Sequence, residues 1–513
     1  MAQQIQTFTI SAPGFMGLNT QDSSLDLAQG FALVANNCVI DQYGRIGARK
    51  GWQPQHAVLG ALSTASVKAI GQLVVDDGTE YIAAAGNNKL FKLASGALSE
   101  LTYGGGGTAP TITDSNWQIV SLNQCLYFFQ TGHDPLVFQP LVSTTTYRRV
   151  SEMTGYLGTA PQANVALSAY GRLWVAATSS DKTVVAFSDI LAGQVWTTGT
   201  SGTLDVSTVW PNGADTITGL AAHNGFLFIF GRSTILVYSG ALAPASLQLS
   251  DTVTGIGCIA RDTIQNTGSD IVFLSDTGVR SVLRTIQEKS APFRDLSKNV
   301  RNDLMSAVNG ETAANIKSVY NPFESFYLLT LPVLSSVYCF DMRGSLQDGS
   351  ARVTTWDNIA PLSFCFLRDR SMLIGKAGYI GKYTGFTDNS SSYRFQYFTN
   401  HTDLGTASVT SVLKKISVVV IGGTNQYVSM KWGYDFSSNY YAQTVQIPAQ
   451  GVDYYGVAEY NIAEYSPGIS LQTLIAYPTG SGKVIQTGYE SEISGAALSI
   501  QKIEIQAKNG KLA

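Results

Sequence analysis

A hairpin pattern that recurs seven times along the middle of the chain limits the folds open to it. Each copy is an apolar strand, a short polar or glycine-containing turn, and a second apolar strand that begins 7 to 11 residues after the first. Successive copies start 45 to 55 residues apart. The copies begin at Tyr81, Leu126, Leu173, Phe226, Ile271, Phe326 and Met372.

Several copies follow a further strand-like run, such as VKAIGQLVV or WQIVSL, so that one unit contains three or four short strands. Units of this kind repeated every ~45–50 residues are typical of β-propeller blades. The first strand of each hairpin is apolar on consecutive residues, as expected for a strand buried between neighbouring blades. We therefore predict an all-β protein with a β-propeller of about six to eight blades over residues 65–386. An irregular β-sandwich or barrel with coincidental spacing is the alternative.

The segments on either side of the predicted propeller have a different pattern. Residues 387–393, TDNSSSY, read as a polar linker, and the short runs beyond them alternate apolar and polar residues. This alternation predicts an antiparallel sheet or sandwich with one solvated face over 387–513. We expect residues 1–64 to pack with that domain in a platform outside the propeller. Short helices are expected only around 27–36 and around 295–308.

Charged residues are scarce in this chain. Hydrophobic residues make up 44% and charged residues 13% of the 513 residues, and the net charge is −3. A surface so poor in charge favours an oligomer or a component of an assembly. A protein that grips nucleic acid by neutralising phosphates is basic, which argues against that class. The N-terminus lacks the pattern of a secretory signal, and five dispersed cysteines predict buried free thiols in a reducing compartment.

The sequence lacks motifs for catalysis or cofactor binding. The four histidines His56, His133, His223 and His401 lie in no nucleophile motif and are expected in turns or at the surface. TGSGKV at 479–484 lacks the first glycine and the Ser/Thr of a phosphate loop, so a hairpin turn is expected there. No metal-ligand spacing occurs. We predict no catalytic residue, no cofactor, no metal site and no enzyme activity.

A propeller can also bind or cleave carbohydrate. FSDILAGQVWT (187–197) resembles a degraded Asp-box turn and SDTG (275–278) resembles half of one. A sialidase also needs an arginine cluster and a Tyr–Glu pair, and no spacing selects such a set. A carbohydrate-binding or glycosidase-like receptor-recognition protein is kept as the alternative function.

Both ends of the chain carry a family resemblance. The opening stretch, GFMGLNTQDSSLDLAQGFALVANNCVIDQYGRIGARKGW, contains a Gly-Leu-Asn element, a run with Leu, Gln and Ala, two asparagines, and a turn with Gly, Ile, Arg and Gly. Phe15 and Met16 lie where the family named below often has a second glycine. The closing stretches are LKKISVVV, MKWGYDFSS and VIQTGYESEISGAALSIQKIEIQAKNG. In this order, these elements resemble the tail nozzle proteins of short-tailed bacteriophages, also called tail tubular protein B or tail stabilisation proteins.

The resemblance implies a virion structural protein that forms a homohexameric ring at the distal end of the tail. Such a ring docks beneath the adaptor ring, extends the DNA conduit, retains the packaged genome and opens during ejection. The implied partners are other copies of the chain, the adaptor ring, tail fibres or spikes, genomic DNA that passes without specific binding, and the host outer surface. The implied location is the virion tail, assembled in the host cytoplasm, and no cofactor is implied.

The candidate interface residues belong to the opening stretch: Gly17, Asn19, Asn36, Asn37, Gly44, Arg45, Arg49, Lys50 and Gly51. No Gly-rich strand-to-helix loop surrounds the three basic residues among them, which disfavours a phosphate cradle. We expect these cations to meet carboxylates, either within the subunit or across a ring interface. The two asparagines are expected to bond backbone groups near the end of a short helix or strand.

Overall fold

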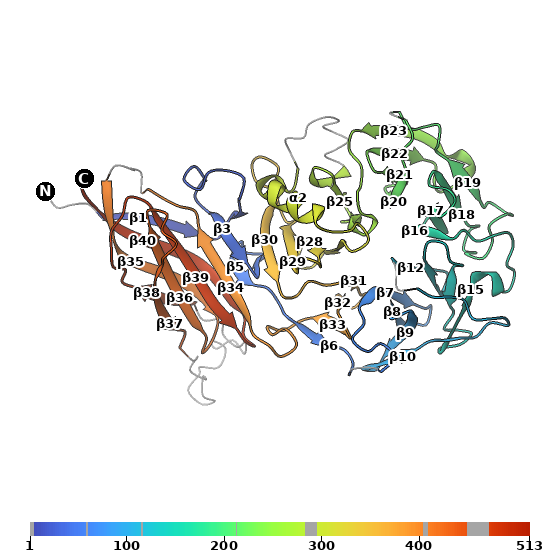
Figure 1. The fold of residues 1–513 in the computed structure, drawn as a ribbon, viewed down its shortest axis with the longest axis horizontal. Helices are drawn as coiled ribbons and strands as arrows, with labels where there is room; N and C mark the ends of the chain where they lie inside the picture. Colours follow the sequence, from blue (N-terminus) through green and yellow to red (C-terminus); the bar gives the residue numbers. More distant parts are fainter. Residues whose placement is uncertain are drawn as a thin grey trace, which may run out of the picture.

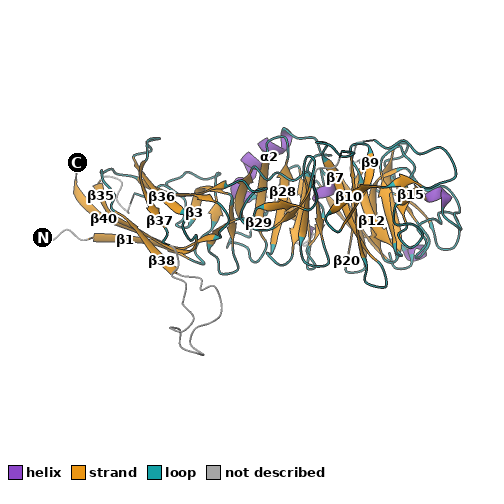
Figure 2. Ribbon diagram, turned by 90° about the horizontal axis from the view of Figure 1, so that it is seen from below, coloured by secondary structure: helices purple, strands orange, loops and turns teal. Residues whose placement is uncertain are grey.

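The chain folds into two parts that lie side by side along the longest axis of the molecule (Figure 1). In this computed structural model the described residues are 5–57, 60–113, 116–211, 213–282, 295–403, 409–448 and 471–512. One part is a β-propeller and the other is a platform of two β-sheets, with both chain ends at the far end of the platform. Seen from below in Figure 2, the platform continues outward from the rim of the propeller.

The propeller has seven blades built mainly of antiparallel strands; six are separate small sheets, and the sixth belongs to a ten-stranded sheet. The innermost strands are β7 (Val67–Val74), β12 (Gln118–Leu122), β16 (Ala163–Ala169), β20 (Ile217–His223), β24 (Gln265–Asn266), β27 (Lys317–Asn321) and β31 (Ser363–Phe366). The second strands are β8 (Glu80–Gly86), β13 (Cys125–Phe129), β17 (Arg172–Thr178), β21 (Phe226–Gly231), β25 (Ile271–Ser275), β28 (Phe326–Leu331) and β32 (Met372–Gly375). The third strands are β9 (Lys89–Ala94), β14 (Leu136–Phe138), β18 (Val184–Phe187), β22 (Thr234–Ser239), β26 (Gly278–Ser281), β29 (Ser336–Asp341) and β33 (Ile380–Tyr383).

Most blades also have an outer strand. These strands are β10 (Ala97–Glu100), β15 (Thr146–Arg149), β19 (Gly202–Asp205), β23 (Gln248–Thr254), β30 (Arg352–Asp357) and, for the seventh blade, β6 (Trp52–Pro54). The short strand β11 (Thr102–Tyr103) adds to the second blade beside β15. The described part of the fifth blade has three strands.

The seven hairpins of the sequence are confirmed as the second and third strands of seven successive blades. Continuous burial of β13 and β28 matches their unbroken apolar sequences, because neighbouring blades cover both faces of each strand. The innermost strands contact one another in order around the axis, and β31 contacts β7 to complete the circle. The blade count of seven lies within the expected range.

The ring is closed by a strand from the opposite end of the chain. β6 pairs with β33 through Gly381↔Pro54, Lys382↔Gln53 and Tyr383↔Trp52. The segment that we expected to lie outside the propeller up to residue 64 therefore supplies the outer strand of the seventh blade. This pairing covers an edge that would otherwise be exposed and ties the beginning of the chain to the end of the propeller.

The platform combines strands from both ends of the chain, as the fold class predicts. One sheet has the order β38 (Leu471–Ala476), β35 (Val409–Gly422), β40 (Leu498–Leu512), β5 (Ile46–Ala48) and β4 (Cys38–Ile40), with β1 (Ile5–Ser11) also paired to β40. The other has the order β3 (Phe31–Asn36), β34 (Tyr393–Thr399), β39 (Ile485–Ile493), β36 (Tyr427–Tyr434) and β37 (Tyr441–Gln446), with β2 (Gly17–Leu18) beside β3.

The second platform sheet is continuous with the sixth blade. β3 pairs with β30 at Asn36↔Thr355 and with β34 on its other side. One apolar core accordingly runs from the space between the platform sheets into the fifth and sixth blades, where it includes Leu304, Tyr327 and Phe340. The two parts of the molecule share both a sheet and a core.

The prediction of a short helix around residues 27–36 is wrong. Residues 31–36 form strand β3, whose buried residues Ala32 and Ala35 lie three apart because a β-bulge interrupts its pairing with β34. The run FALVA is apolar on five consecutive residues, and a short apolar run does not distinguish a strand from a segment of buried helix. The other expectation is confirmed by a short 3-10 turn, Lys298–Val300, followed by α2 (Arg301–Asn309). Residues 477–484 join β38 to β39, which lie in different sheets, so this connection is not the hairpin turn that we expected.

Trp52→Ala tests the importance of ring closure. Trp52 is buried in the core between the sixth and seventh blades, so truncation should lower the free energy of unfolding by about 3–5 kcal/mol, measured by urea denaturation. The matched control is Leu242→Ala, at a side chain that is 68% exposed, which should change it by less than about 0.5 kcal/mol. Equal effects of the two substitutions would contradict the closing role of β6.

Candidate functional site

Arg49 lies fully buried where the platform meets the propeller, and all five of its N–H groups are bonded. Nε donates to Oδ1 of Asn37 at 2.8 Å. The two terminal nitrogens hold the carboxylate of Asp388 in a bidentate pair at 2.9 and 2.6 Å. Their remaining protons go to the carbonyl oxygens of Lys50 and Asp357, at 3.0 and 3.1 Å. A guanidinium with every donor satisfied is the arrangement in which a buried positive charge is tolerated.

The partners of Arg49 come from three separated stretches of the chain. Asn37 follows β3, Asp357 ends β30 of the sixth blade, and Asp388 lies between the seventh blade and β34. The ring of Tyr393 stacks on the guanidinium, 4.0 Å from its carbon, and its hydroxyl donates to the Arg49 carbonyl. The group therefore joins the opening stretch to the sixth blade and to the start of the C-terminal domain.

Asn36 and Asn37 extend this network through their side chains. Their amide groups each donate to one carboxylate oxygen of Asp357, at 2.6 Å in both cases. Asn37 also donates to the Arg394 carbonyl, and it has a φ of 54°, a conformation that asparagine tolerates better than most residues. The expected backbone contacts are therefore present, together with bonds to a carboxylate that the sequence did not indicate.

The other two cations of the opening stretch also meet carboxylates of the same subunit. Lys50 pairs with Glu324 at 2.6 Å, and both side chains are partly exposed. Arg45 pairs with Asp41 at 2.9 Å inside its own turn. In this structure Arg45, Arg49 and Lys50 each meet a carboxylate of their own subunit, which was one of the two expected alternatives. The three cations bind different carboxylates and do not form a single site.

The glycines and Asn19 of the resemblance have backbone roles. Gly17 and Gly44 have φ of 80° and 72°, and a Cβ on Gly51 would lie 2.0 Å from the Thr387 carbonyl oxygen. Asn19 is buried and its Oδ1 accepts from the N–H groups of Gln21 and Asp22. These positions shape the stretch and present no chemistry of their own.

Residues 387–393 are not the plain linker that their composition suggested. Asp388 holds Arg49, and the backbone on either side of it exchanges bonds with Trp52, from Trp52 N–H to the Thr387 carbonyl and from Asn389 N–H to the Trp52 carbonyl. The sequence offered no sign of this pairing because the partners lie more than 300 residues apart.

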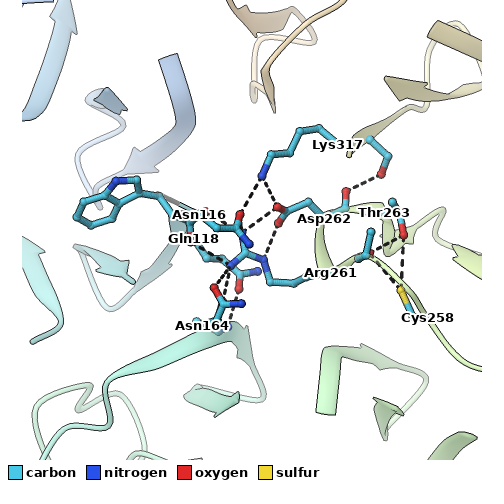
Figure 3. Close-up of polar contacts among 12 residues, drawn as sticks. Asn116, Gln118, Asn164, Cys258, Arg261, Asp262, Thr263 and Lys317 are labelled. Atoms are coloured by element: carbon cyan, nitrogen blue, oxygen red, sulfur yellow. Dashed lines mark hydrogen bonds and ion pairs between the residues drawn. The ribbon is translucent and has the colours of Figure 1, made fainter. Parts of the chain in front are cut away.

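A second polar cluster lies at the propeller axis, among residues of several blades (Figure 3). It surrounds a cavity of about 260 Å³ whose charged lining residues are Lys68, Arg261, Asp262 and Lys317. Asp262 accepts from both cations beside it, at 2.7 and 2.8 Å from Arg261 and through the Lys317 ammonium. The remaining donors of Arg261 go to oxygens of Asn116, Trp117 and Asn164, which include the two asparagine side-chain oxygens.

The charges of this cluster stabilise one another. Burial opposes the ionised form of Asp262, but Arg261 and Lys317 outweigh it and lower the pKa of the carboxyl to about 2. Burial lowers the pKa of the Lys317 ammonium; Asp262 opposes this shift, whereas the charges of Arg261 and Lys68 add to it. The cavity lining that the structure describes thus carries three cations and one anion.

A repeated sequence position could have revealed the cluster. Lys68, Gln118, Asn164 and Lys317 lie at the first or second residue of four innermost strands, in the runs VKAIG, WQIVS, ANVAL and IKSVY. Polar residues at equivalent places in separate blades converge at the axis, because every innermost strand begins at the same face. The apolar pattern of these runs, which predicts the strands, carries no trace of this signal.

One of the four histidines, His56, is part of the propeller core. His56 is buried, contrary to expectation, because its Nε2 accepts the Ile380 N–H at 2.9 Å next to the closing strand. No group of three or more His, Cys, Asp or Glu side chains among the described residues is placed to hold a metal ion. All five cysteines are free thiols, four of them buried. None of the helices in the described part of the chain has the length and apolar character needed to span a membrane.

The platform exposes two uncharged edge strands on the same side. β37 (YAQTVQ) and β38 (LQTLIA) end their respective sheets, contact one another, and have no strand on their outer sides among the described residues. Large apolar or aromatic side chains that are more than half exposed surround them: Tyr427, Tyr441, Leu471 and Tyr477. Edge strands that contain neither lysine nor proline lack two of the features that oppose pairing with another chain.

Comparisons with known proteins add little to this description. No family model and no curated protein matches the sequence. The structure is similar to the extracellular domain of the BT4673 one-component system of B. thetaiotaomicron, with 12% identity and a TM-score of 0.40 over 66% of this chain and 40% of that one. It is also similar to the WD40 domain of Neurospora crassa Pan2 (9% identity, TM-score 0.38, 65% of this chain and 96% of that one). A third similar structure is the WD40 domain of Toxoplasma gondii coronin (10% identity, TM-score 0.36, 68% and 86%).

These likenesses are too weak to bear on function, and the chain spans less than half the length of the first of these proteins. The assignment of a seven-bladed propeller rests on the strand pairing described above.

Arg49→Lys should destabilise the protein although it keeps the charge. Lysine has three donors in place of five and no planar group to lie on Tyr393, so we expect a loss of about 2–4 kcal/mol in urea denaturation. The control, Lys50→Met, removes a partly exposed ion pair and should cost less than about 1 kcal/mol. An unchanged urea midpoint for Arg49→Lys would contradict the role given to this residue.

Asp262→Asn should destabilise the protein by about 3–5 kcal/mol at pH 7, because it leaves Arg261 and Lys317 without a counter-charge. The folded-state pKa of Asp262 lies below its unfolded value, so its contribution is complete above about pH 4 and is lost as the pH falls towards 2. The difference between wild type and variant should therefore narrow from pH 7 to pH 3. Asp276→Asn, at an exposed turn, serves as the control, and a difference that is the same at both pH values would refute the assignment.

Proposed function

We propose that this protein is the structural tail nozzle subunit of a short-tailed phage, which forms a homohexameric ring, docks to the adaptor ring and extends the DNA ejection conduit. The observation that supports this most is the meeting of the two resembling ends in one platform. β5, from the opening stretch, pairs with β40, from the closing stretch, and β40 also pairs with β1 and β35. Elements that resemble one family at both ends of the sequence thus form one body.

The uncharged edge strands β37 and β38 give the platform a surface suited to contacts between copies. Lysine, proline or covering loops at a sheet edge oppose unwanted pairing, and β37 and β38 contain neither lysine nor proline. The exposed Tyr427, Tyr441, Leu471 and Tyr477 add apolar area of the kind that subunit interfaces bury. In a closed ring each copy would use this surface against a different surface of its neighbour.

In this proposal the DNA passes between subunits and not through a propeller. The axis of the propeller is occupied by the Arg261 cluster, and its cavity of about 260 Å³ is far too small for a duplex. A chain with few charges and a net charge of −3 can line a conduit without gripping phosphates. Tail fibres or spikes would attach near the junction of this ring with the adaptor.

The alternative is a propeller that recognises or cleaves carbohydrate, and the axial cavity fits the cleaving version poorly. Most glycosidases need two carboxyl groups, one of which is protonated to act as the acid. Asp262 is the only acidic residue in the lining that the structure describes, and its neighbours hold the pKa near 2. This favours a structural role over hydrolysis.

Negative-stain imaging of the purified full chain tests the proposal. We expect six-fold rings for the wild type and for Ala97→Lys/Ser99→Lys, which places two lysines on the outer strand β10 of the first blade. We expect Ala442→Lys/Thr444→Lys, with the same spacing on β37, to remain monomeric because charged edges oppose pairing.

Other outcomes separate the two functions. A wild-type protein that stays monomeric at high concentration and binds glycans in an array screen would favour the carbohydrate-binding alternative. Six-fold rings formed by the β37 variant would support the hexamer but show that β37 is not part of its interface.

A further inference from the structure

The axial cavity of the propeller has more hydrogen-bond donors than acceptors. Its charged acceptor, Asp262, is already engaged by Arg261 and Lys317. The side-chain oxygen of Asn116 accepts from both of these cations, and that of Asn164 accepts from Arg261. The oxygen of Gln118 accepts the Ala166 N–H at 2.6 Å. Because a guanidinium, an ammonium or a backbone N–H can only donate, these contacts fix which end of each amide is the oxygen.

The donors that remain belong to four side chains of the cavity lining, one of which, Gln265, has given one of its two amide protons to the Ser318 carbonyl. Lys68, half-buried on β7, has no hydrogen bond or ion pair within the part of the chain that the structure describes. Lys317 uses two of its three protons, on Asn116 and Asp262. Gln118 has its NH₂ group left, since its oxygen is the bonded end. The ammonium groups of Lys68 and Lys317 repel each other, and Asp262 is the one anion in the described lining. The ion-pair network therefore lacks a second anion.

We propose that this cavity binds a small oxyanion of the phosphate type, held by Lys68, Lys317 and the amide of Gln118. The lining carries an excess of two positive charges, which matches a divalent anion. A volume of about 260 Å³ lies below the roughly 300–1,000 Å³ of pockets for drug-sized ligands, so it suits an ion and its waters or a small phosphate ester. Charge-assisted bonds from two ammonium groups would supply the affinity.

Arg261 has a different role in this site. All of its donors are used on Asp262 and on oxygens of Asn116, Trp117 and Asn164, so none is left for a ligand. It is a positioning residue that holds the surrounding carboxylate and amides in place, as the dashed contacts in Figure 3 show. The proposal concerns the propeller alone and does not depend on the hexameric ring.

Titration calorimetry of the full chain with inorganic phosphate, at constant ionic strength, tests the site. We expect one phosphate per wild-type chain and a rise in melting temperature with phosphate. Lys68→Met should weaken the affinity about 10-fold or more, since it removes one charge-assisted contact. Lys68→Arg should retain binding. A parallel titration with glycerol 3-phosphate tells whether the cavity also takes a phosphate carried on a larger molecule.

The apo stability of Lys68→Met separates binding from a structural role. Lys68 repels Lys317 and has no partner among the described residues, so its replacement should leave the phosphate-free protein as stable as the wild type or more stable. Lys414→Met, at an exposed lysine of the platform, is the matched control and should change neither quantity. Absence of phosphate binding at millimolar concentration, or equal binding by wild type and Lys68→Met, would overturn the proposal.

Discussion

The buried guanidinium of Arg49 is the interaction on which the arrangement of this molecule depends. A charge removed from water is tolerated only where every donor finds an acceptor, and those acceptors come from the opening stretch, the sixth blade and the segment after the seventh blade. The network therefore forms only when these three stretches are all in place. β6 begins three residues after Arg49 and closes the ring. The same short stretch of chain therefore closes the propeller and joins it to the platform.

This junction has consequences for an assembled protein. The platform and the sixth blade share a sheet through β3 and β30, and one apolar core crosses between them. A load applied to the platform is then carried into the propeller by paired backbone, buried apolar contacts and a bonded charge, without a free linker in between. In the proposed ring, contacts made by the platforms would also fix where the propellers lie.

The sequence predicted the parts of the fold whose signal is local, and failed where partners are distant. The seven hairpins and the alternating C-terminal strands could be read because burial repeats every two residues or every blade. The pairing of Arg49 with Asp388 could not be predicted, because the sequence around either residue contains no signal that identifies its partner. β3 was mistaken for a helix because a short apolar run does not distinguish a strand from a segment of buried helix. The axial cluster had a readable signal, the polar start of several innermost strands, but only comparison of whole blades exposes it.

The Arg49 network makes the platform and the propeller one cooperative body. Differential scanning calorimetry of the wild type and of Arg49→Met measures this directly, by comparing the calorimetric enthalpy with the van't Hoff enthalpy. The account predicts a single transition with equal enthalpies for the wild type, and two resolved transitions or a calorimetric enthalpy well above the van't Hoff value for the variant. Two separate transitions in the wild type, or a variant that unfolds as one unit at the wild-type temperature, would contradict it.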